Sequence, residues 1–464
     1  MRVGVGVPAK SSRGSGLSYI ISAMTTDTWL TTKADGHLSE RVARGWTWDA
    51  DATTLHLKLR TDVRLHDGTL LTPQTAAAAI RETVASEGQA TSFTRVRSVE
   101  PDGADGLVLK LSEPNSFLLS DLAQVSVTVE KGKQTESTGP FQMVRQDPQH
   151  VELRAFAQYF RGRPALDQVL VTTYPTQRNA WAALMRGEID MLYDISPEAF
   201  DFVKAETTVS TYTFQRPYYN VLVFNVRHPV LKNADVRRAL TEALDKDTLV
   251  KDGMRGRGRP ADGPLVPEHW AYSPPAHPLV YDPDAAVAAL DRAGLKARPV
   301  PDGRMPSRFA FTCLVFADDT RFERLAVLVQ KQLADVGVDM RLEPVPALDL
   351  IGRVAKGDFD AFLFEMVGVS PSWADAFWYS RDNRFFNSGY KAADPALDRI
   401  RLARSDEEIR AGVSDFFRIL NDDPPAVFLA WQETSRSVSR RFDVAGEPGR
   451  DIMTSAWRWR LVTP

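Results

Sequence analysis

The sequence predicts an α/β protein with two lobes, and three observations indicate this. The chain has 464 residues, more than the roughly 250 to 300 at which one hydrophobic core stops growing. Residues 230–425 alternate between helical and extended patterns, as α/β domains do. Residues 426–431 form an apolar strand pattern and residues 457–461 alternate as another. We therefore expect the C-terminal segment to return to a sheet formed earlier in the chain.

The first well-defined elements lie between residues 36 and 76. Residues 46–48 and 55–59 alternate apolar and polar side chains on either side of a turn, which predicts two half-buried strands. An Asp-Gly pair at 67–68 predicts a tight turn. Thr72 followed by Pro73 is typical of a helix N-cap and first helical residue, so a helix should run through the alanines that follow.

Later helices are indicated by apolar residues on one face and by residues that favour helix ends. Asp282 before Pro283 predicts one helix start, and Gly294 predicts its end. Phe322 to Gly337 reads as a helix that leads directly into an alternating strand. The predicted helices are 176–187, 236–249, 282–294, 322–337 and 350–356, and the predicted strands are 338–345 and 359–366.

Composition excludes several classes of partner and site. The chain is 43% hydrophobic and 25% charged with a net charge of −3, so we expect neither nucleic acid nor an anionic membrane as partner. Cys313 is the only cysteine and lies in an apolar run, which predicts a buried thiol and excludes a disulfide framework. No run of 18 apolar residues occurs, and the sequence as given shows no export signal or anchor.

A series of short motifs in a fixed order covers nearly the whole chain. It resembles the extracellular solute-binding proteins, family 5, which serve ATP-binding-cassette (ABC) importers of peptides, nickel and some oligosaccharides. The motifs include Ala43-Arg44-Gly45-Trp46, His66-Asp67-Gly68-Thr69, Thr138-Gly139-Pro140-Phe141, the run 159–167, Gly187-Glu188-Ile189-Asp190, the run 236–240 and Tyr281-Asp282-Pro283.

The resemblance implies a two-lobe periplasmic-binding-protein-like clamp (type II, cluster C) with an extra subdomain in lobe one. Such a clamp binds its ligand in a cleft and closes over it by hinge motion. Lobe one would comprise residues 1–30, the extra subdomain 31–136, and the segments 137–227 and 430–464, while lobe two would be 228–429. The chain would cross between lobes near residues 225–230 and 426–431.

The resemblance also places a ligand-contacting loop at residues 369–378, followed by Asn387-Ser388-Gly389-Tyr390. In peptide-binding members an Asp in this loop receives the ligand's α-ammonium, and Asp375 matches it. A carboxylate suits that role because a charge-assisted hydrogen bond in a dry cleft is stronger than a neutral one. The family usually has Trp three residues before this Asp, whereas here Ser372 stands there and Trp373 follows. The ligand contacts we predict are Tyr219, Trp373, Ala374, Asp375, Trp378, Phe386 and Asn387.

Two alternatives remain open for this loop. Its aromatic side chains would also suit stacking on apolar groups or sugar faces, so an oligosaccharide or another non-peptide ligand is an alternative. In a purely structural interpretation, Asp375 caps a helix that begins at Ala376 and the aromatics form core. The basic run 255–259 is interpreted as a solvated loop, and the pair His66-Asp67 is not interpreted as a metal site.

The function predicted from these observations is solute capture for an ABC importer, most simply of a dipeptide or oligopeptide. We find no nucleophile motif, phosphate-binding glycine loop or metal-binding pattern, so we expect no catalytic residue, cofactor or metal. The expected partners are a small-molecule or peptide ligand and the permease subunits, with a monomeric protein located in the periplasm or at the cell surface. The alternative role is an intracellular ligand sensor.

Overall fold

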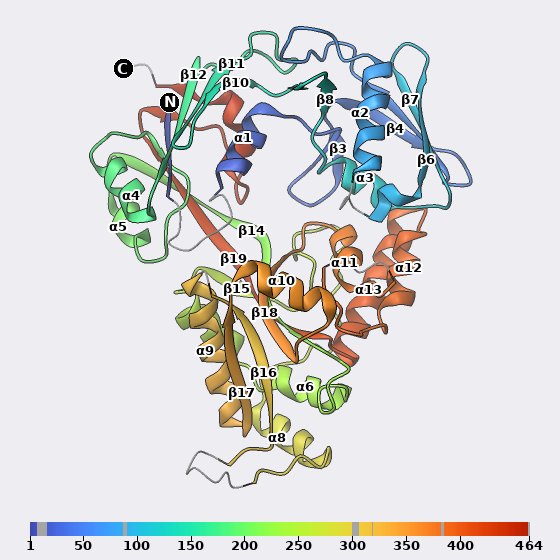
Figure 1. Cartoon of the computed structure of the whole chain (residues 1–464), viewed down its shortest axis with the longest axis vertical. Coiled ribbons are helices and arrows are strands. Elements are labelled where there is room, and N and C mark those ends of the chain that lie inside the picture. The colour runs from blue at the N-terminus through green and yellow to red at the C-terminus, as the bar shows by residue number, and fades with distance from the viewer. Residues whose placement is uncertain (7–15, 87–90, 299–305, 318, 382–384, 463–464) are drawn as a thin grey trace. The chain divides into compact units, whose positions relative to one another are not determined.

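The computed structural model describes residues 1–6, 16–86, 91–298, 306–317, 319–381 and 385–462 (Figure 1). The chain divides into two compact units: unit 1 comprises residues 1–215 and 434–464, and unit 2 comprises residues 216–433. Both boundaries fall inside long strands, β14 (Val209–Phe224) and β19 (Ala426–Ser439). Both strands continue through the boundary as uninterrupted extended segments. The crossings near residues 225–230 and 426–431 stay a prediction.

The main sheet of unit 1 has the order β10-β11-β12-β1-β13, followed by the C-terminal part of β19. β1 runs parallel to β12 and β13, while β13 pairs antiparallel with β19 at Val438 and Ser437. The strands are β1 (Arg2–Gly6), β10 (Phe141–Gln146), β11 (His150–Ala155), β12 (Gln168–Tyr174) and β13 (Met191–Leu192). Helices α1 (Leu17–Thr25), α4 (Gln177–Met185) and α5 (Phe200–Ala205) complete this part.

A second region of unit 1 builds its own hydrophobic core between residues 29 and 129. Its four-stranded antiparallel sheet has the order β4-β5-β7-β6. Thr72 caps α2, accepting a hydrogen bond from the Thr75 backbone N–H, and Pro73 begins the helix, as predicted. The elements are β2 (Leu30–Thr32), β3 (Leu38–Glu40), β4 (Ala43–Trp48), β5 (Thr54–Leu59), α2 (Pro73–Ala85), the 3₁₀ helix η1 (Thr91–Arg95), β6 (Val96–Asp102), β7 (Gly106–Leu111), α3 (Phe117–Leu122), β8 (Thr128–Lys131) and β9 (Gln134–Ser137).

The C-terminal residues of unit 1 differ from the prediction. β19 returns to the sheet of β1 and β13, but residues 457–461 do not form the predicted second strand of that sheet. Asp451 accepts a hydrogen bond from the Met453 backbone N–H and starts the 3₁₀ helix η3 (Ile452–Arg458). Only β21 (Arg460–Leu461) follows, paired with β20 (Phe442–Asp443). The alternating pattern of residues 457–461 arises instead because Trp459 is buried, with an exposed fraction of 0%.

Unit 2 contains helices and a sheet with both parallel and antiparallel strand pairs, as its α/β pattern predicts. β16 (Phe309–Phe316) pairs parallel with β17 (Val338–Val345) and β18 (Ala361–Val367), and β14 pairs antiparallel with β18. β15 (Gly258–Pro260) pairs with β19. The helices are α6 (Ala234–Glu242), α7 (Lys246–Thr248), the π-helical turn η2 (Leu249–Gly253), α8 (Pro283–Arg292), α9 (Thr320–Asp335), α10 (Ala347–Lys356), α11 (Pro371–Trp378), α12 (Asp394–Arg401) and α13 (Asp406–Asp422).

Three details of unit 2 bear on the predictions. The helix expected at 236–249 ends at Glu242, because Asp245 caps a new helix by accepting a hydrogen bond from the Thr248 backbone N–H. Cys313 is buried, and burial raises the pKa of its thiol. The basic run 255–259 is not a solvated loop throughout, since its last residues belong to β15 and Arg257 pairs with Glu433 at 2.7 Å.

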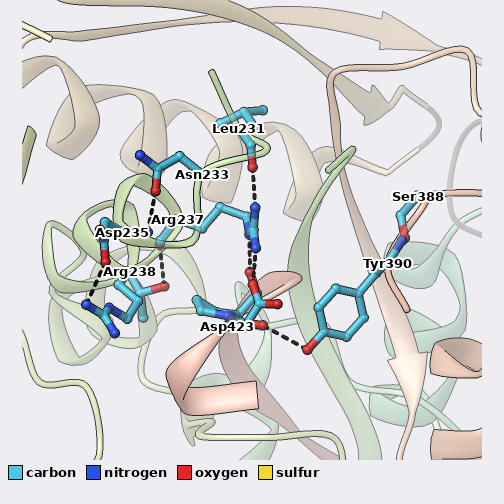
Figure 2. A network of polar contacts seen from close by, with 10 residues as sticks. Leu231, Asn233, Asp235, Arg237, Arg238, Ser388, Tyr390 and Asp423 are labelled. Carbon is cyan, nitrogen blue, oxygen red and sulfur yellow. Dashed lines mark hydrogen bonds and ion pairs between the residues drawn. The ribbon is translucent and has the colours of Figure 1, made fainter. Parts of the chain in front are cut away.

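A buried polar network holds α6 against the segment that leads into β19 (Figure 2). The Arg237 guanidinium donates to the backbone oxygens of Leu231 and Pro424, the latter at 2.7 Å, and it forms an ion pair with Asp423. The Tyr390 hydroxyl donates to the Asp423 backbone oxygen at 2.8 Å. Arg237 is 2% exposed, so these partners replace the water that its charge would otherwise require.

Candidate functional site

The candidate site in unit 2 is built on α11, which follows β18 after a short loop. Ser370 occupies the N-cap position and Pro371 begins the helix, which is the arrangement that a fixed proline φ favours. Asp375 therefore lies inside the helix, where its backbone oxygen accepts a hydrogen bond from Tyr379 at 3.0 Å. The interpretation of Asp375 as the cap of a helix beginning at Ala376 is wrong.

The predicted contact residues of α11 differ in exposure. Asp375 is 2% exposed and Ala374 is 3% exposed, so a carboxylate is held in a largely dry environment on this helix. Trp373 is half-buried. Its ring stacks on Phe377 with a centroid distance of 5.6 Å and lies 6.3 Å from the ring of Phe385, which is 44% exposed. Trp373 and Phe385 thus form the accessible edge of an aromatic cluster.

The buried part of the same cluster extends from α11 into the sheet. Trp378 packs edge-on against Phe386 at 5.4 Å and Phe428 at 5.7 Å. Tyr219 contacts Phe428 at 5.6 Å and Trp431 at 5.1 Å. Tyr219, Trp378 and Phe386 are at most 3% exposed, so these three side chains are core of unit 2 in this conformation.

Tyr219 lies in β14 with its hydroxyl in a nearly apolar environment. The hydroxyl is 3.7 Å from the Met366 sulfur, a weak acceptor. Burial raises the pKa of Tyr219, because the phenolate would have to form away from water.

Asn387 and Tyr390 lie at the opposite end of β18 from α11. The Asn387 side-chain oxygen accepts a hydrogen bond from Arg227 at 2.8 Å, and its backbone N–H donates to Val354 at the end of α10. Tyr390 belongs to the Arg237 network described above (Figure 2). Phe386, the residue before Asn387, contacts Trp378 of α11, whereas the side chain of Asn387 is hydrogen-bonded to Arg227. The structure therefore brings Trp373, Ala374, Asp375 and Trp378 together but not Asn387.

Sequence reasoning missed a polar network close to the α11 end of β18. The Gln432 side-chain amide, 5% exposed, donates to Glu365 at 2.7 Å and to Asn220 at 3.3 Å. Its oxygen accepts a hydrogen bond from Arg216 at 3.2 Å. The network joins β14, β18 and β19. Its sequence signal was Glu365, a carboxylate inside the otherwise apolar run 361–367, because such a residue needs a polar partner.

Among the described residues, no group of three or more His, Cys, Asp and Glu side chains is placed to hold a metal ion. His66 is hydrogen-bonded to the Gly139 backbone oxygen at 3.0 Å and to Ser137 at 3.2 Å. Burial lowers the pKa of His66, so the neutral ring is favoured. In the part of the chain that the structure describes, no helix is both long enough and apolar enough to cross a bilayer.

Comparisons with known proteins agree with this architecture. The family described as bacterial extracellular solute-binding proteins, family 5 middle, matches residues 37–388. The heme-binding protein A of Haemophilus influenzae is 27% identical over 50% of this chain and 41% of its own length. The dipeptide-binding protein of Escherichia coli is 25% identical over 63% of this chain and 55% of its own length. The chain thus spans about half the length of these curated relatives.

A solved structure confirms the predicted fold class. NikA from Brucella suis, determined in complex with Fe(III)-EDTA, superimposes with a TM-score of 0.86 at 19% identity, covering 100% of both chains. At this identity the likeness shows the fold alone. The curated relatives are named for what they bind and not for a reaction, as expected for a binder. Because the family match covers most of the chain, the chain belongs to the bacterial extracellular solute-binding proteins of family 5.

Proposed function

We propose that this protein is the substrate-binding component of an ABC importer and that it captures a dipeptide or oligopeptide. The observation that carries the proposal is Asp375, a carboxylate 2% exposed on α11 beside the half-buried ring of Trp373. An ammonium group that enters this environment would gain a charge-assisted hydrogen bond with little competition from water. The Escherichia coli relative, named as a dipeptide-binding protein, supports this choice of ligand.

In this proposal the residues of α11 have separate roles. Asp375 receives the ligand's α-ammonium, and Trp373 with Ala374 lines the adjacent surface. Tyr219, Trp378 and Phe386 support the helix from the core, since none of them is more than 3% exposed. Hinge closure and delivery to a membrane permease, in the periplasm or at the cell surface, belong to the same proposal. β14 and β19 are the strands within which the chain passes between the units.

The test compares a peptide that has a free amino terminus with one that does not. Titration calorimetry would measure alanyl-phenylalanine and its N-acetyl form against the wild-type protein and Asp375→Asn. We expect the free peptide to bind the wild type at least tenfold more tightly than the acetylated form, and Asp375→Asn to abolish this preference. Losing one partner of a desolvated charge pair costs roughly 3 to 5 kcal/mol, which is ample for such an effect.

Asp394→Asn is the matched control. Asp394 is also a buried carboxylate of unit 2, at 7% exposed, but it accepts hydrogen bonds from the Ser380 backbone at 2.9 Å and hydroxyl at 2.6 Å. This variant should lower the melting temperature while leaving the preference for the free amine intact. If Asp375→Asn instead destabilises the protein and the preference persists, Asp375 is structural and the amine assignment fails.

A second candidate is an importer component for an oligosaccharide or another ring-bearing ligand. The observation that favours it is the accessible aromatic edge, where Phe385 is 44% exposed and lies 6.3 Å from Trp373. Aromatic faces of this kind stack on sugar rings as well as on apolar side chains. A thermal-shift screen that included oligosaccharides beside peptides would distinguish the two candidates by which class raises the melting temperature.

A further inference from the structure

A pocket in unit 1 has no role in the function proposed above. It opens between the start of α4, the end of β13 and α5, and it has a volume of about 170 Å³. The apolar part of its lining comes from Trp181, Leu192, Ala199 and Phe202. This volume admits a molecule of single-ring size. Figure 1 locates α4 and α5 at one side of the main sheet of unit 1.

The aromatic lining of the pocket is unusually accessible. Phe202 is 68% exposed, although burial of a phenylalanine side chain is favourable. Its ring lies 6.2 Å from the ring of Trp181 at an interplanar angle of 35°. These two rings form one wall against which a planar apolar group could pack.

Two hydrogen-bond donors of α4 line the same pocket. Arg178 and Trp181 are three residues apart in the helix, which places them on one face. The Trp181 indole Nε1 is buried and has no acceptor among the described residues. With the described residues, the Arg178 guanidinium forms neither an ion pair nor a hydrogen bond. A cation and a neutral donor on one face together favour an anionic acceptor.

One carboxylate of the pocket already has partners. Asp194 also lines the pocket, but it accepts a hydrogen bond from Thr434 at 3.3 Å and lies 3.7 Å from the buried guanidinium of Arg436. The Arg436 guanidinium therefore offsets part of its negative charge. Glu198 lines the pocket as well, so a cationic ring compound is the competing class of ligand, and the experiment must include one.

We propose that this pocket is a second binding site, for a small aromatic carboxylate, in which Arg178 and the Trp181 indole N–H hold the carboxylate while Trp181 and Phe202 contact the ring. The site is independent of Asp375, and its existence does not depend on which ligand α11 receives. Arg178 and Phe202 are exposed side chains whose replacement should not disturb folding.

The test uses two fluorinated single-ring probes of opposite charge. Fluorine NMR titration would measure 4-fluorophenylacetate and 4-fluorobenzylamine against the full chain. We expect the carboxylate to bind and the amine to bind at least about tenfold more weakly. Arg178→Gln should weaken carboxylate binding about tenfold, as expected for loss of a charge-assisted hydrogen bond. Trp181→Phe, which keeps a ring but removes the N–H, should weaken it about threefold to tenfold.

Arg186→Gln is the matched control, because Arg186 follows the last residue of the same helix, pairs with Glu188 at 2.6 Å and does not line the pocket. It should leave binding unchanged, and so should Asp375→Asn. The proposal is overturned if neither probe binds the wild type, if the amine binds more tightly, or if Arg178→Gln and Phe202→Ala both bind 4-fluorophenylacetate as the wild type does. If the melting temperatures of these variants are unchanged, any loss of probe binding results from the change in the pocket and not from unfolding.

Discussion

Replacing Arg237 by methionine tests whether the network in Figure 2 stabilises unit 2. Methionine keeps most of the side-chain volume and removes the charge together with every donor. Asp423 is 36% exposed, so water can partly replace its lost partner. The backbone oxygens of Leu231 and Pro424 lose their hydrogen bonds to Arg237, at about 1 kcal/mol each. With the lost ion pair, the variant should be about 3 kcal/mol less stable.

The assay is thermal and urea unfolding of the full chain. For a folding unit of 150 to 250 residues, 1 kcal/mol shifts the melting temperature by roughly 2 to 4 °C, so Arg237→Met should melt roughly 6 to 12 °C lower. The control is Arg238→Met at the next position of α6. The Arg238 side chain is 43% exposed and pairs with the exposed Asp235 at 2.7 Å, so its loss should cost about 0.5 kcal/mol or less.

Equal effects of the two substitutions would refute the reasoning, because burial of the guanidinium is the only large difference between them. A loss of less than about 1 kcal/mol in Arg237→Met would have the same meaning, since it would show that the desolvation cost of the charge had already cancelled its contacts.

Three further predictions concern single positions. Burial lowers the pKa of Lys246 to about 8 from 10.5, so between these pH values the unfolded chain binds more protons than the folded chain. In this range the stability of the wild type relative to Lys246→Met should therefore rise with pH, by at most about 1.4 kcal/mol per pH unit. Unfolding measured as a function of pH would test this. Cys313, whose thiol pKa is raised by burial, should react with a thiol reagent only in denaturant. Gly139→Ala should lower the free energy of unfolding in urea by more than about 2 kcal/mol, because its Cβ would lie 2.2 Å from the Thr25 backbone. As a control, Gly352→Ala should raise the free energy of unfolding by about 0.5 to 1 kcal/mol, because Gly352 lies inside α10 with open space around its Cβ position.

The fold could be predicted wherever local rules and long-range packing favour the same structure. Thr72 with Pro73 predicted the start of α2, and Asp282 with Pro283 predicted that of α8, because capping depends only on neighbouring residues. The prediction failed at residues 457–461, where alternating aromatics satisfied the strand pattern. There the cap at Asp451 and the burial of Trp459 decided the conformation, and both depend on residues outside the window that a pattern covers.

The candidate site could be predicted only in part, because a linear motif does not show which end of a strand a side chain reaches. Asp375 and Trp373 are neighbours in one helix, so their proximity followed from the sequence. The family pattern groups Asn387 with them, but the intervening chain returns along β18 and places the Asn387 side chain against Arg227. Gln432 and Asn220 meet only because β14 and β19 lie side by side, a contact between residues 212 positions apart. A half-buried carboxylate in an apolar strand, such as Glu365, is the one local sign of such a network, since its partial burial favours a polar partner from elsewhere.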